Sequence, residues 1–142
     1  MSEATGTRVK QLGRRVRVLV ADDHPIIRRA VRSVLQAQPH FEVCGEATDG
    51  AQAIQEAQKL TPDVIVLNVT MPVLNGFEAA REIKTILPKS AIVILSQDAD
   101  RRFIEEAKKI GVQAYVAKSK AGEALVKAVE AAVTGEDFFL VE

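Results

Sequence analysis

The sequence has little of what marks secreted or membrane proteins. It contains one cysteine, Cys44, so no internal disulfide can form. No apolar run approaches the roughly 20 residues that a membrane helix needs, and the opening segment MSEATGTRVKQLGRRVR has no apolar signal-peptide core. A lone thiol in the apolar setting FEVCGEA is typical of a reducing compartment. We therefore expect a cytoplasmic protein with no membrane partner.

The chain also lacks an excess of either charge. Lys plus Arg and Asp plus Glu both number 19, so no global field favours nucleic acid or a membrane surface. The basic residues of segment 1–15 form only a short patch, and such a polar segment is typical of a flexible, solvated leader. Any nucleic-acid partner would therefore need a local binding surface.

The length and apolar content predict one globular domain. The chain has 142 residues, of which 47% are hydrophobic, enough for one core and too few for a second large one. We assign a leader to 1–15, the folded domain to 16–134, and a C-terminal tail or the start of a linker to 135–142. The apolar residues Phe138, Phe139 and Leu140 in that tail either pack back on the domain or begin the linker.

Short apolar runs alternate with segments of helical period along the domain. Apolar residues recur at helical spacing between the runs, and Gly and Pro punctuate the boundaries. The alternation predicts five βα units, with strands at 16–21, 41–47, 63–67, 91–95 and 113–117.

Five consecutive βα units predict a doubly wound α/β fold. Right-handed crossovers require a parallel sheet with helices on both faces, and its strands should be almost continuously apolar, as VIVL and IVIL are. In such sheets the functional site lies beyond the carboxyl ends of the strands. The residues that follow the strands are therefore the candidates for function.

Polar residues follow four of the five predicted strands. Asp22 and Asp23 follow the first, Asn68 the third, Ser96 the fourth and Lys118 the fifth. Each has an ordinary structural explanation: an Asp caps a helix, a Ser occupies a turn, and a Lys is solvated. Their combination at one edge of a sheet instead indicates a phosphoryl-binding site, since such chemistry needs a hard cation, a lysine and a hydroxyl around the transferred group.

The chain resembles the receiver domain of bacterial two-component response regulators over about residues 16–134. The segments that carry the resemblance are VLVADDHP, PDVIVLNVTMPVLNGFEAAREI, AIVILSQ and AYVAKS, in this order and spacing. DDHP and AKSKAGEAL are most similar to the subfamily with a C-terminal helix-turn-helix output domain. The resemblance implies the flavodoxin-like strand order 2-1-3-4-5.

The resemblance also implies a magnesium site and a phosphoacceptor. Asp23 would ligate Mg²⁺ directly, Asp22 would hold it through water, and the backbone carbonyl of Thr70 would be a further ligand. Position 68 would accept the phosphoryl group.

Further residues would respond to the phosphoryl group. Ser96 would hydrogen-bond it, Lys118 would pair with it, and Tyr115 would turn inward as Ser96 moves. Pro72 and Gly76 would shape the loop over the site.

Position 68 departs from the family pattern, because Asn68 stands where the family has Asp. A carboxamide is a poor nucleophile, so we expect no phosphorylation here. The amide oxygen of Asn68 could still face Mg²⁺, but binding should weaken because one carboxylate of three is missing. Asp22, Asp23, Ser96 and Lys118 are all retained around position 68. Two origins of Asn68 fit this: an engineered replacement of Asp by Asn, or a naturally unphosphorylated domain that still uses the site.

The implied partners follow the family. They are a sensor histidine kinase, a second copy of the chain, and DNA only through an output domain that this chain lacks. The second copy would bind through the fourth predicted helix, in DADRRFIEEAKKIG, and the last one, which contains Leu125 and Val133. The alternative is a phosphorylation-independent interaction module.

Enzymatic alternatives fit poorly. A dinucleotide-binding domain would need a glycine-rich turn after the first strand, where VADDHPII has carboxylates. A phosphatase or dehalogenase-like hydrolase would need an Asp nucleophile at position 68 and a spaced second acid. We therefore expect a signalling domain and not an enzyme.

Overall fold

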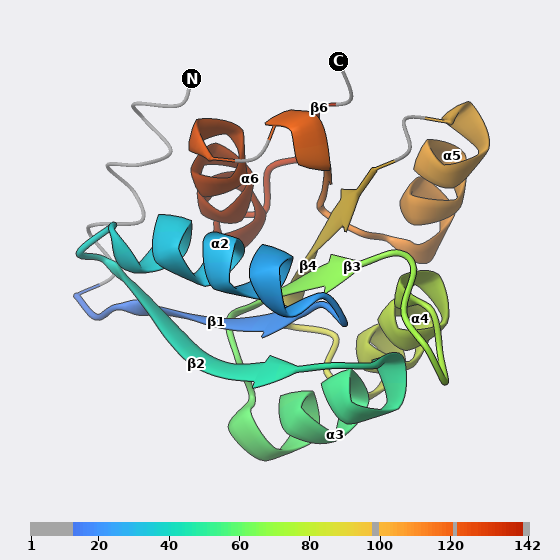
Figure 1. The fold of residues 1–142 in the computed structure, drawn as a ribbon, viewed down its shortest axis with the longest axis horizontal. Helices are drawn as coiled ribbons and strands as arrows, with labels where there is room; N and C mark the ends of the chain where they lie inside the picture. The colour runs from blue at the N-terminus through green and yellow to red at the C-terminus, as the bar shows by residue number, and fades with distance from the viewer. Residues whose placement is uncertain (1–12, 98–99, 121, 141–142) are drawn as a thin grey trace.

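The structure, a computed structural model, describes residues 13–97, 100–120 and 122–140. Strands and helices alternate along the chain, as Figure 1 shows. The strands are β1 (Val16–Ala21), β2 (Phe41–Ala47), β3 (Val64–Asn68), β4 (Ala91–Ser96), β5 (Ala114–Ala117) and β6 (Phe138–Leu140). The helices are α2 (Pro25–Gln36), α3 (Gly50–Leu60), α4 (Gly76–Ile86), α5 (Arg101–Ile110) and α6 (Glu123–Val133), with a short 3₁₀ helix η1 (Lys118–Lys120) after β5.

The strands form one parallel sheet in the order β2-β1-β3-β4-β5-β6. The predicted doubly wound fold and the order of its first five strands are confirmed. The sixth strand differs from the prediction of five. Residues 138–140 pair with the edge of β5, and the rings of Phe138 and Phe139 pack on opposite faces of the sheet. The chain after α6 therefore returns to the sheet.

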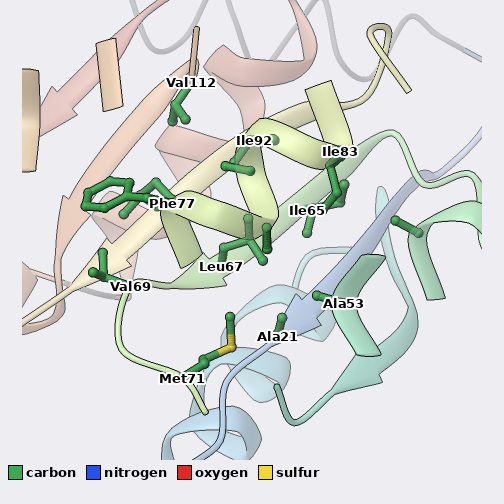
Figure 2. Packing of buried hydrophobic residues seen from close by; sticks show 14 of the residues in the cluster. Ala21, Ala53, Ile65, Leu67, Val69, Met71, Phe77, Ile83, Ile92 and Val112 are labelled. Atoms are coloured by element: carbon green, nitrogen blue, oxygen red, sulfur yellow. The ribbon is translucent and has the colours of Figure 1, made fainter. Parts of the chain in front are cut away.

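Helices cover both faces of the sheet and create two separate cores. Helices α2 and α6 pack on one face, where Val31, Leu35, Leu125 and Val129 meet alternate residues of the central strands. Helices α3, α4 and α5 cover the other face, and Figure 2 shows part of this second core. Because both faces are covered, every residue of β3 is buried, as expected for a central parallel strand.

The loop between β3 and α4 is held close to the end of β3. The backbone N–H of Gly76 donates to the carbonyl of Val69 at 2.7 Å. A Cβ on Gly76 would overlap the backbone carbonyl of Asn68 and lie 2.9 Å from the Cα of Val69. Helix α4 then begins with a capping box, in which Asn75 and Glu78 each accept a backbone N–H of the other. Glycine is therefore required where the loop turns into the helix.

The predicted leader, 1–15, lies largely outside the described residues. Within the described part, the Arg14 guanidinium donates to both carboxylate oxygens of Asp63, at 2.8 and 3.0 Å. Among the helices of the described residues, none is long and apolar enough to span a membrane.

Candidate functional site

The ends of four strands bring the predicted polar residues to one edge of the sheet. Strands β1, β3 and β4 are neighbours, so Asp22, Asn68 and Ser96 follow or end adjacent strands. These three residues are 2–3% exposed, although their side chains are polar. Lys118 begins η1 directly after β5, and its side chain is 11% exposed. Burial of this many polar groups at one place requires a specific network of partners.

A pocket of about 380 Å³ opens at this edge. It is lined by His24, Asn68, Thr70, Ser96, Gln97, Phe103 and Lys118. The structure therefore gathers the predicted phosphoacceptor position, the hydroxyl and the lysine around one space.

Asp22 and Asp23, the acid pair, lie beside this pocket and are held in place by the start of α2. The backbone N–H of His24 donates to Asp22 Oδ1 at 2.9 Å. The Nδ1 atom of His24 lies 3.3 Å from Asp22 Oδ1 and 3.1 Å from Asp23 Oδ1. One oxygen of each carboxylate thus faces the same imidazole nitrogen, and the three residues form a cluster of metal-ligating groups.

The other oxygen of Asp22 faces the lysine. Lys118 Nζ lies 3.5 Å from Asp22 Oδ2, within ion-pair distance. Among the atoms of the described residues, Oδ2 has no hydrogen-bond partner although it is buried. The pair is therefore held by charge and not by a well-directed hydrogen bond, and this oxygen retains the capacity to bind a further ligand.

The side chain of Asn68 points its nitrogen at the acid pair. Its Nδ2 atom donates to the Thr70 carbonyl at 2.7 Å, to Asp23 Oδ1 at 3.3 Å and to Asp22 Oδ1 at 3.5 Å. The predicted ligand groups of Mg²⁺ therefore converge on one point, and in this chain an amide nitrogen lies at that point.

Tyr115 lies near the site but in a different environment. It is fully buried in the core beneath α3, α4 and α5, and it is not among the described residues that line the pocket.

Sequence reasoning gave no role at the site to Arg28 and His24. Arg28 Nη1 donates to the backbone carbonyl of Asp22 at 2.8 Å, and its Nε donates to Glu46 Oε1 at 2.9 Å. This guanidinium ties the acid pair to β2. The DDHP segment already placed His24 beside the two acids, whereas the partner of Arg28 on β2 is distant in the sequence.

Helix α5 supplies Phe103 to the pocket wall. The helix begins after Asp100, whose side chain accepts the backbone N–H of Arg102. The Arg102 side chain also donates to Asp100, and these hydrogen bonds lower the pKa of Asp100 to about 2. The cap of α5 therefore stays ionised at ordinary pH.

The donor set suits a hard divalent cation. The acid pair and the Thr70 carbonyl offer oxygen atoms, which Mg²⁺ prefers, and no sulfur ligand is present in this cluster of described residues. The oxygen groups therefore fit Mg²⁺ in kind, whereas the Asn68 nitrogen and His24 Nδ1 do not.

Comparison with known proteins identifies the family. The model of the response regulator receiver domain matches residues 18–130, which is most of the chain. The chain belongs to the response regulator receiver domain family. The match spans β1 to α6, so all the strand ends that form the site lie within it.

The relatives of this receiver domain include transcriptional regulators. The transcriptional regulatory protein YxjL of Bacillus subtilis is 39% identical over 125 residues, which cover 88% of this chain and 57% of YxjL. The chain therefore spans little more than half the length of this relative.

Solved structures agree with the sequence match. A LuxR-family two-component response regulator from Aurantimonas is 32% identical with a TM-score of 0.84, and the match covers 87% of this chain and 89% of the other. The receiver domain of the putative regulator NarL from Mycobacterium tuberculosis is 31% identical with a TM-score of 0.83, covering 87% and 99%. The receiver fold is thus supported by both sequence and structure, and the similar proteins include transcriptional regulators.

Proposed function

We propose that this receiver domain is a switch whose Asn68→Asp form would accept a phosphoryl group from a sensor histidine kinase in a Mg²⁺-dependent reaction. With Asn68, the chain is not phosphorylated. The observation that carries the proposal is the convergence of Asp22, position 68, Ser96 and Lys118 on one buried edge of the sheet.

Each residue has a role in this proposal that follows from its chemistry. In the Asn68→Asp form, a carboxylate oxygen attacks the phosphorus of the donor, the new O–P bond forms, and the donor's bond to phosphorus breaks. Lys118 and Ser96 stabilise the negative charge of the phosphoryl oxygens. Bound Mg²⁺, held by Asp22, Asp23 and the Thr70 carbonyl, would neutralise part of the same charge.

The proposed output is transcriptional and lies outside the receiver domain. Relatives such as YxjL are transcriptional regulators of greater length, and we propose that DNA binding belongs to an output domain distinct from the receiver domain. A cytoplasmic location fits a partner kinase and a DNA target. Tyr115 would report the state of Ser96 to the neighbouring helices.

Intact-mass measurement tests the proposal. Protein with Asn68 and its Asn68→Asp variant are each incubated with Mg²⁺ and acetyl phosphate. We expect one added phosphoryl group on Asn68→Asp and none on the unaltered chain, because only the carboxylate is a nucleophile. Asn68→Asp combined with Lys118→Ala should gain the group more slowly. A phosphoryl group on the unaltered chain, or none on Asn68→Asp with Mg²⁺ bound, would contradict the proposal.

A second function is favoured by the hydrogen bonds of Asn68. Because this side chain has partners without any metal or phosphoryl group, the domain can be a phosphorylation-independent interaction module. Partner binding that is equal for Asn68 and for Asn68→Asp with phosphodonor would support this alternative.

A further inference from the structure

We propose that the side-chain amide of Asn68 takes the place of the divalent cation in the acid pocket, so that the folded pocket of this chain does not depend on Mg²⁺. The inference deepens the proposed function, since it rests on this pocket being the metal site.

The contacts of Asn68 Nδ2 carry the inference. Its three acceptors come from the end of β1 and from the loop after β3, and they are the same groups proposed to surround the metal. An amide has two N–H groups, so at least one is shared between two of these acceptors. The nitrogen, which carries partial positive charge on its hydrogens, thus supplies to the carboxylates what a cation would supply.

The neighbours also fix the orientation of the amide. Carboxylate and carbonyl oxygens accept hydrogen bonds and cannot donate them, so the alternative orientation would place the amide oxygen against three acceptors. That arrangement would be repulsive unless a cation lay between them. Binding of Mg²⁺ therefore requires the amide to turn and to give up the 2.7 Å hydrogen bond to Thr70.

Burial makes this exchange costly. Asn68 is 3% exposed and Asp22 is 2% exposed, so water has little access to replace the lost hydrogen bonds. Charge acts in the same direction: Lys118 pairs with Asp22, whereas a carboxylate at position 68 would add a third negative charge beside Asp22 and Asp23 and so strengthen the attraction for a cation. The Asn68 amide therefore weakens Mg²⁺ binding, and its N–H groups take over the stabilisation of the carboxylates that the ion would provide.

The variant Asn68→Ala separates this inference from the simpler view that the Asn68 oxygen is a weak ligand. If the amide obstructs the ion, removing it opens the site and Mg²⁺ binds more tightly than to the unaltered chain. If the oxygen is a ligand, removing it weakens binding. The two ideas predict opposite signs.

Isothermal titration with Mg²⁺, after removal of metal with a chelator, measures the sign. We expect the tightest binding for Asn68→Asp, at least about tenfold tighter than for Asn68→Ala because of the added carboxylate. The unaltered chain should bind most weakly. Gln58→Ala, which removes an exposed amide on α3 away from this pocket, is the matched control and should bind like the unaltered chain. Equal or weaker binding by Asn68→Ala than by the unaltered chain would overturn the inference.

A second measurement observes Asn68 directly in the unaltered protein and uses Asn68→Asp only to set the Mg²⁺ concentration. In ¹⁵N-labelled unaltered protein, the side-chain NH₂ signals of Asn68 should stay unchanged at Mg²⁺ concentrations that saturate Asn68→Asp. A shift of these signals that saturates over the same range would overturn the inference. Failure of Asn68→Asp to accept a phosphoryl group would leave the order of the three Mg²⁺ affinities intact, so it is distinguishable from failure of this inference.

Discussion

The ring of Phe139 lies almost parallel to the ring of Tyr115, with centroids 6.5 Å apart and an angle of 10° between the planes. The two residues are register partners on β6 and β5. Lys108 of α5 lies over the same Phe139 ring, with Nζ 5.0 Å from its centroid. Strand β6 and helix α5 thus together cover the residue that we propose as part of the switch.

Removing the Phe139 ring should loosen Tyr115. We expect Phe139→Ala to lower the free energy of unfolding by about 1–3 kcal/mol, less than for a fully buried Phe because this ring is partly buried. The chain has one tyrosine and no tryptophan, so tyrosine fluorescence reports on Tyr115 alone. Acrylamide should quench it more strongly in Phe139→Ala. Phe138→Ala, on the opposite face of the sheet, should lose stability without this increase; equal quenching in both would contradict the assignment.

Gly76 should not tolerate a side chain. Glycine to alanine in a helix ordinarily stabilises by up to about 1 kcal/mol. Here the added Cβ would overlap the Asn68 carbonyl, so we expect Gly76→Ala to destabilise by about 1–3 kcal/mol. Chemical denaturation measures the difference.

The effect of Gly76→Ala should also reach the site, because the overlapping carbonyl belongs to Asn68. In the Asn68→Asp background, Gly76→Ala should slow phosphoryl transfer from acetyl phosphate. Gly135→Ala is the control: its Cβ would meet open space, and only its positive φ of 81° adds strain. Slowing by both substitutions alike would show that the loop contact is not the cause.

The first five strands could be predicted because each is an apolar run bounded by turn residues. The predicted 16–21 and 41–47 agree with β1 and β2, and the predicted 63–67 differs from β3 by one residue at each end. Strand β6 could not be assigned in the same way. It has three residues, and its extended form depends on the free edge of β5, a partner that local pattern does not reveal.

At the site, too, some features follow from the sequence pattern and others depend on contacts made only in the folded chain. The position of Asn68 at a strand end follows from the sequence, because strand ends share one edge of a parallel sheet. The direction of its amide does not, because it depends on oxygen atoms from Asp22, Asp23 and Thr70 that only the folded chain brings together. The sequence therefore led to an expectation for the amide oxygen where the nitrogen lies.

Activation should promote self-association through the edge of the sheet at β6, which α5 and α6 flank on opposite sides. We expect Asn68→Asp with Mg²⁺ and beryllofluoride to form a weak dimer in sedimentation velocity over a concentration series. Lys108→Glu on α5, an exposed residue that lies over Phe139 of β6, should alter this association, whereas Lys59→Glu on α3 should not. A strictly monomeric activated protein at high concentration would rule out the dimer.

Asp63 should make stability depend on acidic pH. Burial by itself would raise the pKa of Asp63, but hydrogen bonds from the Arg14 guanidinium and the Arg17 backbone N–H together lower it below 3.8. The folded chain then releases this proton more readily than the unfolded chain. The stabilisation is therefore complete above about pH 3.8 and is lost as the pH falls through the lower folded pKa.

We expect Asp63→Asn to lower the free energy of unfolding at neutral pH by about 1–2 kcal/mol, because the amide cannot replace a carboxylate that accepts three hydrogen bonds. Arg14→Ala should cost only about 0.5 kcal/mol, since the Arg14 side chain is 58% exposed and its ion pair is screened by solvent. Urea denaturation over a pH series measures both differences. The gap between Asp63→Asn and the unaltered chain should narrow as the pH falls below the unfolded pKa of Asp63, because protonation then removes the same charge from the unaltered chain. A gap that stays constant through this range would mean that packing, and not the ionised carboxylate, accounts for the effect.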